Sequence, residues 1–182
     1  SRQAAGDATD GGRVRDSNDD VDRGRRPFVP SRRRGGMEDA ELGRVAGRVT
    51  DLVTAPESGA PPERRDEVDL DAGGVVGDRY HAGEGTFQLD ACAVTLVAAE
   101  ALAAVRAETG IDVTDGRHRR NVVVEGVGEG LDDLLEATVA VGDAVVRPTR
   151  RRPPCAHVEE LAGEDGLASA LSERGGLCAD VV

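Results

Sequence analysis

The chain of 182 residues, 38% of them hydrophobic, has the size and apolar content of one globular domain with some excess. Its formal net charge of -12 at pH 7, without a single lysine and with only 2% aromatic residues, argues against nucleic-acid binding. No stretch approaches the ~18 consecutive apolar residues of a membrane span, and three cysteines without paired spacing predict no disulfide scaffold, so we expect a soluble, cytoplasmic protein with reduced thiols.

Residues 1–36 contain seven apolar residues, nine arginines and six acids, without a helical or strand period. This composition predicts a disordered tail. Because the only methionine is Met37, we expect the native domain to occupy residues 37–182 and the tail to be dispensable for folding. The stretch RRPFVP resembles half of a twin-arginine export signal, but the charged SRRRGGMEDAEL follows it, so no export is predicted.

Residues 37–182 carry 14 arginines and 29 acids, a balance of -15. An acidic surface that avoids lysine suits molar salt, in which the Debye length falls to ~3 Å and self-repulsion is screened. We therefore expect a halophilic source.

After Met37, short runs typical of strands alternate with glycine-bearing turns. The stretch ACAVTLVAAEALAAVRAETG, residues 91–110, starts as an apolar strand and continues as a helix that ends at Gly110. Two strands are predicted to meet at Gly142-Asp143, one short helix to follow Cys155, and another to cover residues 167–173. The other predicted strand regions are residues 43–54, 66–72 and 119–128. This pattern predicts a mostly β, barrel-like α+β fold with two or three short helices.

The stretch RRRPPCAHVEEL, residues 150–161, contains the strongest candidate for chemistry. Two prolines fix the approach to Cys155, and the charge of Arg150, Arg151 and Arg152 favours a thiolate, which is the nucleophile and the metal ligand. The alternative is that this cysteine is a small, buried hydrophobic residue in a turn. His157 is typical of a structural surface histidine, and a partner for the thiol is the second interpretation.

Two further stretches contain candidate binding residues. Asp78 and Arg79 follow the turn GGVVG, whose glycine spacing does not fit a dinucleotide fingerprint. In GRHRRNVVVEG, the guanidinium groups of Arg117, Arg119 and Arg120 suit a phosphate, and the Asn121 amide can pair with a planar heterocycle. A solvated basic turn is the alternative. The cysteines and histidines lack the clustered spacing of a zinc site.

Six stretches, in this order and at these spacings, resemble the MOSC domain, the family named for the C-terminal domain of molybdenum cofactor sulfurases: GDRYHAGEGTF, VTLVAAEAL, RRNVVVEGV, AVGDAVV, PPCAHVEEL and ERGGLCADVV. The resemblance spans about residues 42–182, implies a β-rich barrel-like fold, and places Cys155 at the family's reactive-cysteine position. Family members continue through a G-x-I-x-x-G-D segment that is missing here, so we expect the barrel to lack a closing strand or the sequence to be cut short.

The resemblance implies two chemistries. Cys155 would either ligate molybdenum in a cofactor-dependent reductase of N-hydroxylated substrates or carry sulfur as a persulfide for assembly of metal–sulfur centres. The cofactor residues expected on this basis are Asp78, Arg79, Arg119, Arg120, Asn121, Arg150, Arg151, Arg152 and His157. Pyridoxal phosphate, which belongs to the desulfurase domain of full-length sulfurases, is disfavoured because a chain without lysine cannot form an internal Schiff base.

The expected partners are the molybdenum cofactor and a sulfur-donor or electron-transfer protein. The alternative, from a different functional class, is a non-catalytic module that binds a pterin or a partner enzyme.

Overall fold

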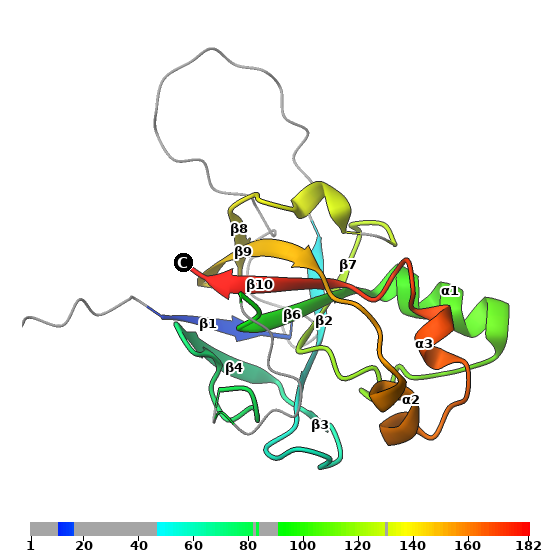
Figure 1. Ribbon diagram of the computed structural model, residues 1–182. Coiled ribbons are helices and arrows are strands. Elements are labelled where there is room, and N and C mark those ends of the chain that lie inside the picture. The colour runs from blue at the N-terminus through cyan, green and yellow to red at the C-terminus, as the bar shows by residue number, and fades with distance from the viewer. Residues whose placement is uncertain (1–10, 17–46, 82, 84–90, 130) are drawn as a thin grey trace, which may run out of the picture.

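The computed structural model, which describes residues 11–16, 47–81, 83, 91–129 and 131–182, contains two β-sheets (Figure 1). The larger, curled sheet has seven strands in the order β3 (Glu63–Arg64), β2 (Arg48–Thr54), β7 (Val122–Glu125), β6 (Val94–Ala98), β10 (Leu177–Val181), β9 (Ala144–Arg151) and β8 (Val139–Val141). The smaller sheet has the order β1 (Gly12–Arg15), β4 (Glu67–Asp71) and β5 (Gly74–Val75). The predicted mostly β, barrel-like fold is confirmed.

Among the described residues, three α-helices gather at one side of the large sheet: α1 (Ala99–Thr109), α2 (Ala156–Ala162) and α3 (Leu167–Ala170) (Figure 1). A 3-10 turn, η2 (Asp132–Leu134), precedes β8. No helix among the described residues has the length and apolarity to cross a membrane.

The central strand β6 is buried on both of its faces and separates two hydrophobic clusters. Leu96 belongs to the cluster that the two sheets enclose, together with residues of β1, β4 and β10. Val97 belongs to the cluster beneath the helices, with Leu102 of α1 and Val158 of α2. Because successive side chains of a strand point to opposite faces, one apolar strand supplies both clusters.

The strand-to-helix transition predicted for residues 91–110 is confirmed. The helix α1 follows β6 directly and ends at Gly110, whose φ of 78° is left-handed and whose N–H donates to the Arg106 carbonyl. The predicted hairpin is also confirmed, since β8 and β9 pair around Gly142, which has a φ of 61°. The predicted helix at residues 167–173 is shorter, because α3 ends at Ala170.

The prediction of a disordered tail over residues 1–36 is wrong for Gly12–Arg15. These residues form β1, which pairs antiparallel with β4, and the Val14 side chain is completely buried in the core. Four residues with one apolar side chain carry too little alternation to reveal a strand, so long-range pairing with β4 determines this one. The other residues of that tail lie outside the described residues, apart from Gly11 and Asp16.

The expectation of reduced thiols is wrong for two of the three cysteines. Cys92, just before β6, and Cys178, in β10, form a disulfide with a Cα–Cα distance of 4.6 Å. Their sequence separation of 86 residues leaves no local motif, but pairing of β10 with β6 brings them together.

Candidate functional site

Cys155 stands where the chain leaves the large sheet and enters α2. After β9, the Arg152 N–H donates to the Gly176 carbonyl at 2.7 Å, and the two prolines that follow have no N–H to continue the ladder. Cys155 is extended, with a φ of -139°, and is the residue immediately before α2. Among the described cysteines it is the free one, and it is exposed. The predicted alternative of a buried turn residue is therefore wrong.

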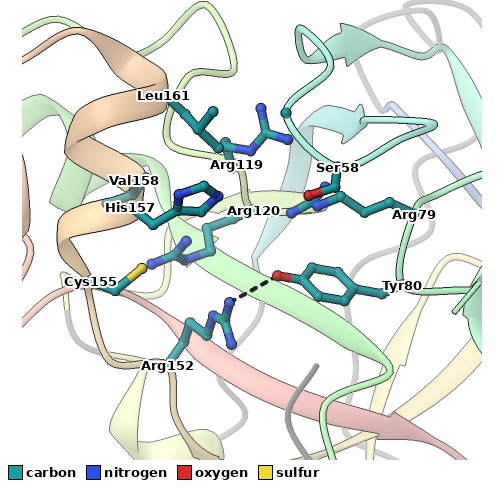
Figure 2. A pocket seen from close by; sticks show the side chains of 11 residues that line it. Ser58, Arg79, Tyr80, Arg119, Arg120, Arg152, Cys155, His157, Val158 and Leu161 are labelled. Carbon is teal, nitrogen blue, oxygen red and sulfur yellow. Dashed lines mark hydrogen bonds between the residues drawn. The ribbon is translucent and has the colours of Figure 1, made fainter. Parts of the chain in front are cut away.

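The thiol borders a small pocket of about 30 Å³ (Figure 2). Three segments surround it: the loop after β2, the turn after β5, and the α2 region, with Arg119 and Arg120 between them. The lining residues are Ser58, Gly59, Arg79, Tyr80, Arg119, Arg120, Arg152, Cys155, His157, Val158 and Leu161.

Arg120 is the most buried of the four lining arginines, with 4% of its surface exposed. Its Nε donates to the Gly175 carbonyl at 2.7 Å and its Nη1 to the His118 carbonyl at 3.1 Å, whereas Nη2 has no hydrogen-bond partner in the described structure. Burial lowers the Arg120 pKa to about 9, the neighbouring Arg152 charge adds to the lowering, and a charged Cys155 opposes it. The group therefore stays cationic at neutral pH, and Figure 2 shows the Cys155 thiol beside it.

His118 holds the backbone of Arg120 through a hydrogen bond. Its Nδ1 accepts a hydrogen bond from the Arg120 backbone N–H at 3.0 Å, which places the ring proton on Nε2. Complete burial, with the Arg120 charge as a second cause, lowers the His118 pKa to about 3. The ring is therefore neutral and acts as an acceptor that orients the Arg120 backbone.

Arg119 and Arg152 also present guanidinium nitrogens without partners. Arg119 donates through Nη1 to the Ala60 carbonyl at 2.8 Å, but its buried Nη2 is unpaired in the described structure. Burial, followed by the charge of Arg79, lowers the Arg119 pKa. Arg152 donates through Nη2 to the Tyr80 hydroxyl at 3.4 Å, and its buried Nε is unpaired there too.

Two predicted site residues, Asp78 and Asn121, do not line the pocket. The Asp78 carboxylate accepts hydrogen bonds from the Ala55 N–H at 3.0 Å and the Tyr80 N–H at 3.1 Å, and it pairs with Arg79 at 3.3 Å. The buried Asn121 amide oxygen accepts from the Thr95 N–H and hydroxyl. Both side chains are thus occupied with structural hydrogen bonds, and Asn121 has no free edge for a heterocycle.

Arg79 and Tyr80 form the wall opposite Cys155. The Arg79 guanidinium lies over the Tyr80 ring, 4.3 Å from its centroid, in a cation–π contact that keeps both groups in place. His157, on the first turn of α2, lines the pocket on the cysteine side, and its Nδ1 lies 3.6 Å from Glu160.

Arg150 and Arg151 do not join the Cys155 pocket, although the sequence predicts them as cofactor residues. They line a neighbouring cavity of about 340 Å³, in which Arg151 pairs with Asp132 and with Glu173, the latter at 3.5 Å. The strand β9 ends at Arg151, and of the three arginines it is Arg152, directly after the strand, that reaches the Cys155 pocket, although all three line the larger cavity. Arg152 lines both cavities.

Sequence reasoning missed Ser58, Gly59, Tyr80, Val158 and Leu161. Tyr80 directly follows two predicted residues and could have been found from GDRYHAG. Ser58 and Gly59 lie in the loop after β2, whose sequence gives no signal of a site. Among the described residues, no group of three or more histidines, cysteines or acids could hold a metal ion on its own.

Comparison with solved structures identifies similar folds. The YUAD protein from Bacillus subtilis is 21% identical with a TM-score of 0.61, covering 74% of this chain and 87% of its own. A hypothetical protein is 16% identical with a TM-score of 0.54, covering 72% of this chain and 59% of its own. YiiM from Geobacillus stearothermophilus is 21% identical with a TM-score of 0.45, covering 51% of this chain and 48% of its own.

No curated protein matches the sequence. The MOSC domain model, in contrast, matches residues 77–181, a span that includes Arg79, Arg120 and Cys155 of the pocket. Since this match covers more than half of the chain and the fold agrees with it, the chain belongs to the MOSC domain family.

Proposed function

We propose that this MOSC domain binds the molybdenum cofactor at the Cys155 pocket and that the Cys155 thiolate is the protein ligand of the metal. The main supporting observation is that one free, exposed cysteine and four arginines line a single pocket. A soft thiolate suits molybdenum, and guanidinium groups suit a phosphate.

The donor set fits an anionic cofactor. Arg119, Arg120 and Arg152 each keep a buried guanidinium nitrogen without a partner in the described structure, and such donors favour an acceptor with several oxygens. These three residues would hold the phosphate of the pterin, and Cys155 would supply the thiolate to the metal. The bound cofactor would supply the redox chemistry of a reductase of N-hydroxylated substrates.

The chain's own contribution is to position charge. Three hydrogen bonds hold the Arg120 backbone and guanidinium in place, so little side-chain entropy is lost when an anion binds. The Arg79–Tyr80 pair closes the opposite wall. His157, which lines the pocket on the cysteine side, would offer a ring nitrogen to a bound group.

A persulfide carrier is the second candidate function, and the exposure of Cys155 favours it. A carrier must offer its sulfur to a donor and then to an acceptor, and an exposed thiol at the start of a helix can meet both. The same cysteine serves both functions, and in both the sulfur atom is the reacting group.

Metal analysis tests the cofactor proposal. We expect the protein, purified from a host that makes the cofactor, to contain molybdenum and phosphopterin, and Cys155→Ser to lose activity while folding normally. Arg152→Gln should lower the phosphopterin content, whereas Arg147→Gln, within β9 and paired with Glu136 outside the pocket, should not.

Equal phosphopterin in the two arginine variants, or none in the wild type, would contradict the proposal. Cofactor bound without reductase or sulfur-transfer activity would instead favour the alternative of a non-catalytic binding module.

A further inference from the structure

The anion-binding groups and the reactive sulfur occupy the same small pocket. Arg120 is nine-tenths buried or more, its Nη2 has no partner in the described structure, and its guanidinium lines the pocket beside Cys155 (Figure 2). Two more unpaired nitrogens, on Arg119 and Arg152, belong to residues that line it as well. An anion held by these donors would therefore lie next to the thiol.

The dimensions of the pocket favour a compact anion. A volume of about 30 Å³ corresponds to roughly two water-sized probes, so it admits a tetrahedral oxyanion or the phosphate end of a larger molecule. The Asp78 carboxylate is already engaged with Arg79 and two backbone N–H groups, and the Glu160 carboxylate lies 3.6 Å from His157 Nδ1. The pocket thus offers cationic donors to a ligand that carries several oxygens.

We propose that this pocket takes a small sulfur oxyanion with a terminal sulfane sulfur, of the thiosulfate class, and that the oxyanion loads Cys155 with sulfur directly. This proposal rests on the persulfide-carrier form of the proposed function and names its sulfur donor. It requires no protein donor for the loading step.

The loading step is a thiol exchange in which atoms and charge balance. The Cys155 thiolate attacks the sulfane sulfur, a new S–S bond forms with the electron pair of the thiolate, and the S–S bond of thiosulfate breaks. Its electron pair leaves with sulfite. The products are a Cys155 persulfide with one negative charge and a sulfite dianion, and no proton is taken up or released.

The arginines have a specific part in this step. A thiolate and a thiosulfate dianion repel each other in water, and three guanidinium groups around the sulfonate oxygens would neutralise that repulsion. They would also stabilise the negative charge that remains on the departing sulfite. The neutral reagent iodoacetamide, which alkylates the same thiolate, shares any effect of these groups on thiolate formation but has no charge for them to bind.

The test compares two reactions of Cys155 in the full chain with its disulfide intact. Thiosulfate is added, and the persulfide on the peptide that contains Cys155 is measured by mass spectrometry together with released sulfite. We expect one sulfur per chain and one sulfite per persulfide. Arg119→Gln and Arg152→Gln should each slow this reaction by roughly 10- to 100-fold, the range for one charge-assisted hydrogen bond.

Iodoacetamide alkylation of Cys155 is the internal control, because it reports any change in the amount of thiolate that the lost arginine causes. The thiosulfate rate divided by the alkylation rate should still fall by roughly 10- to 100-fold in both variants, because only thiosulfate carries charge for the arginines to hold. Arg147→Gln should react as the wild type does with both reagents. Inorganic sulfate should slow the thiosulfate reaction and leave the alkylation unchanged. Equal thiosulfate rates in Arg152→Gln and Arg147→Gln would overturn the proposal.

A second sulfur donor separates this proposal from the function on which it rests. If glutathione persulfide loads Cys155 and thiosulfate does not, the carrier function stands and the oxyanion donor is wrong. If neither loads it, both are wrong. If sulfate or phosphate binds without any persulfide from thiosulfate, the arginines serve the cofactor's phosphate alone, and the donor assignment is again overturned.

Discussion

His118 makes the stability of the domain depend on pH below the ordinary histidine range. The folded ring has a pKa of about 3 because burial disfavours its charged form, whereas an unfolded histidine titrates near 6.5. Between these values the unfolded chain binds the proton and the folded chain does not. Acidification over that range therefore lowers the free energy of unfolding, by up to about 1.4 kcal/mol per pH unit.

Denaturant unfolding of the wild type and His118→Gln at pH 7, 6, 5 and 4 would measure this slope. We expect the variant to lose part of the wild type's decline between pH 6 and 4, because glutamine does not titrate, whatever its stability at pH 7. Titration of the carboxylates is common to both proteins and cancels in the difference. Parallel curves would show that His118 is not the source of the slope.

Residue identity and local motif were enough to predict most of the pocket. The prolines before Cys155 and the arginines of RRN suggest a thiol site and an anion site from residue type alone. Of the residues predicted in this way, the pocket is lined by Arg79, Arg119, Arg120, Arg152 and His157, together with Cys155 itself. The role of Asn121 could not be deduced from the sequence. Its amide oxygen accepts a hydrogen bond from the Thr95 N–H, and the two residues are brought together by the parallel pairing of β6 and β7. The buried position of His118 depends likewise on distant packing.

At the scale of elements, β1 is expected to stabilise the small sheet through one side chain. Val14 is fully buried, so Val14→Ala should lower the free energy of unfolding by about 1–3 kcal/mol through lost contacts and a cavity. Val76→Ala, at a valine that is 46% exposed, should change it by less than about 0.5 kcal/mol. Chemical denaturation of the two variants gives the comparison, and equal effects would show that β1 does not contribute to stability.

The disulfide is the second feature at this scale that lies beyond local sequence patterns. It closes a loop of 86 residues, so its removal by Cys92→Ala and Cys178→Ala together should cost about 2–4 kcal/mol, mainly through a less constrained unfolded state. Thermal unfolding of the double variant beside the wild type measures the loss. The iodoacetamide reactivity of Cys155 should stay unchanged, and a large change in it would mean that the disulfide also shapes the pocket.

Regular elements were predicted where local signals agree with the fold. Gly110 ends α1 and Gly142 turns the β8–β9 hairpin, both with left-handed backbone that glycine adopts without strain. Elements that depend on distant pairing, such as β1 with β4, leave no such signal. Local sequence therefore predicts the elements that neighbouring residues determine, but not those that depend on pairing between distant parts of the chain.

At the scale of the whole molecule, charge sets the expected response to salt. The chain has a net charge of -12, and lowering the salt from 1 M to 0.1 M lengthens the screening distance from ~3 Å to ~10 Å. We expect the thermal midpoint to fall and structure to be lost below about 1 M salt, because self-repulsion grows. Circular dichroism during dialysis from high to low salt is the measurement, and an unchanged spectrum and midpoint would contradict the expectation.

The position of β10 has a consequence for how the protein folds during its synthesis on the ribosome. This strand comes after every strand it joins, yet it lies between β6 and β9 in the middle of the large sheet. Translation at ~5–20 residues per second leaves both neighbours with open edges until residues 177–181 emerge from the exit tunnel. During that interval, β6 and β9 present unpaired backbone to other nascent chains. We expect a ribosome-stalled chain that ends before residue 177 to be bound by chaperones, and release of the finished strand to end that dependence.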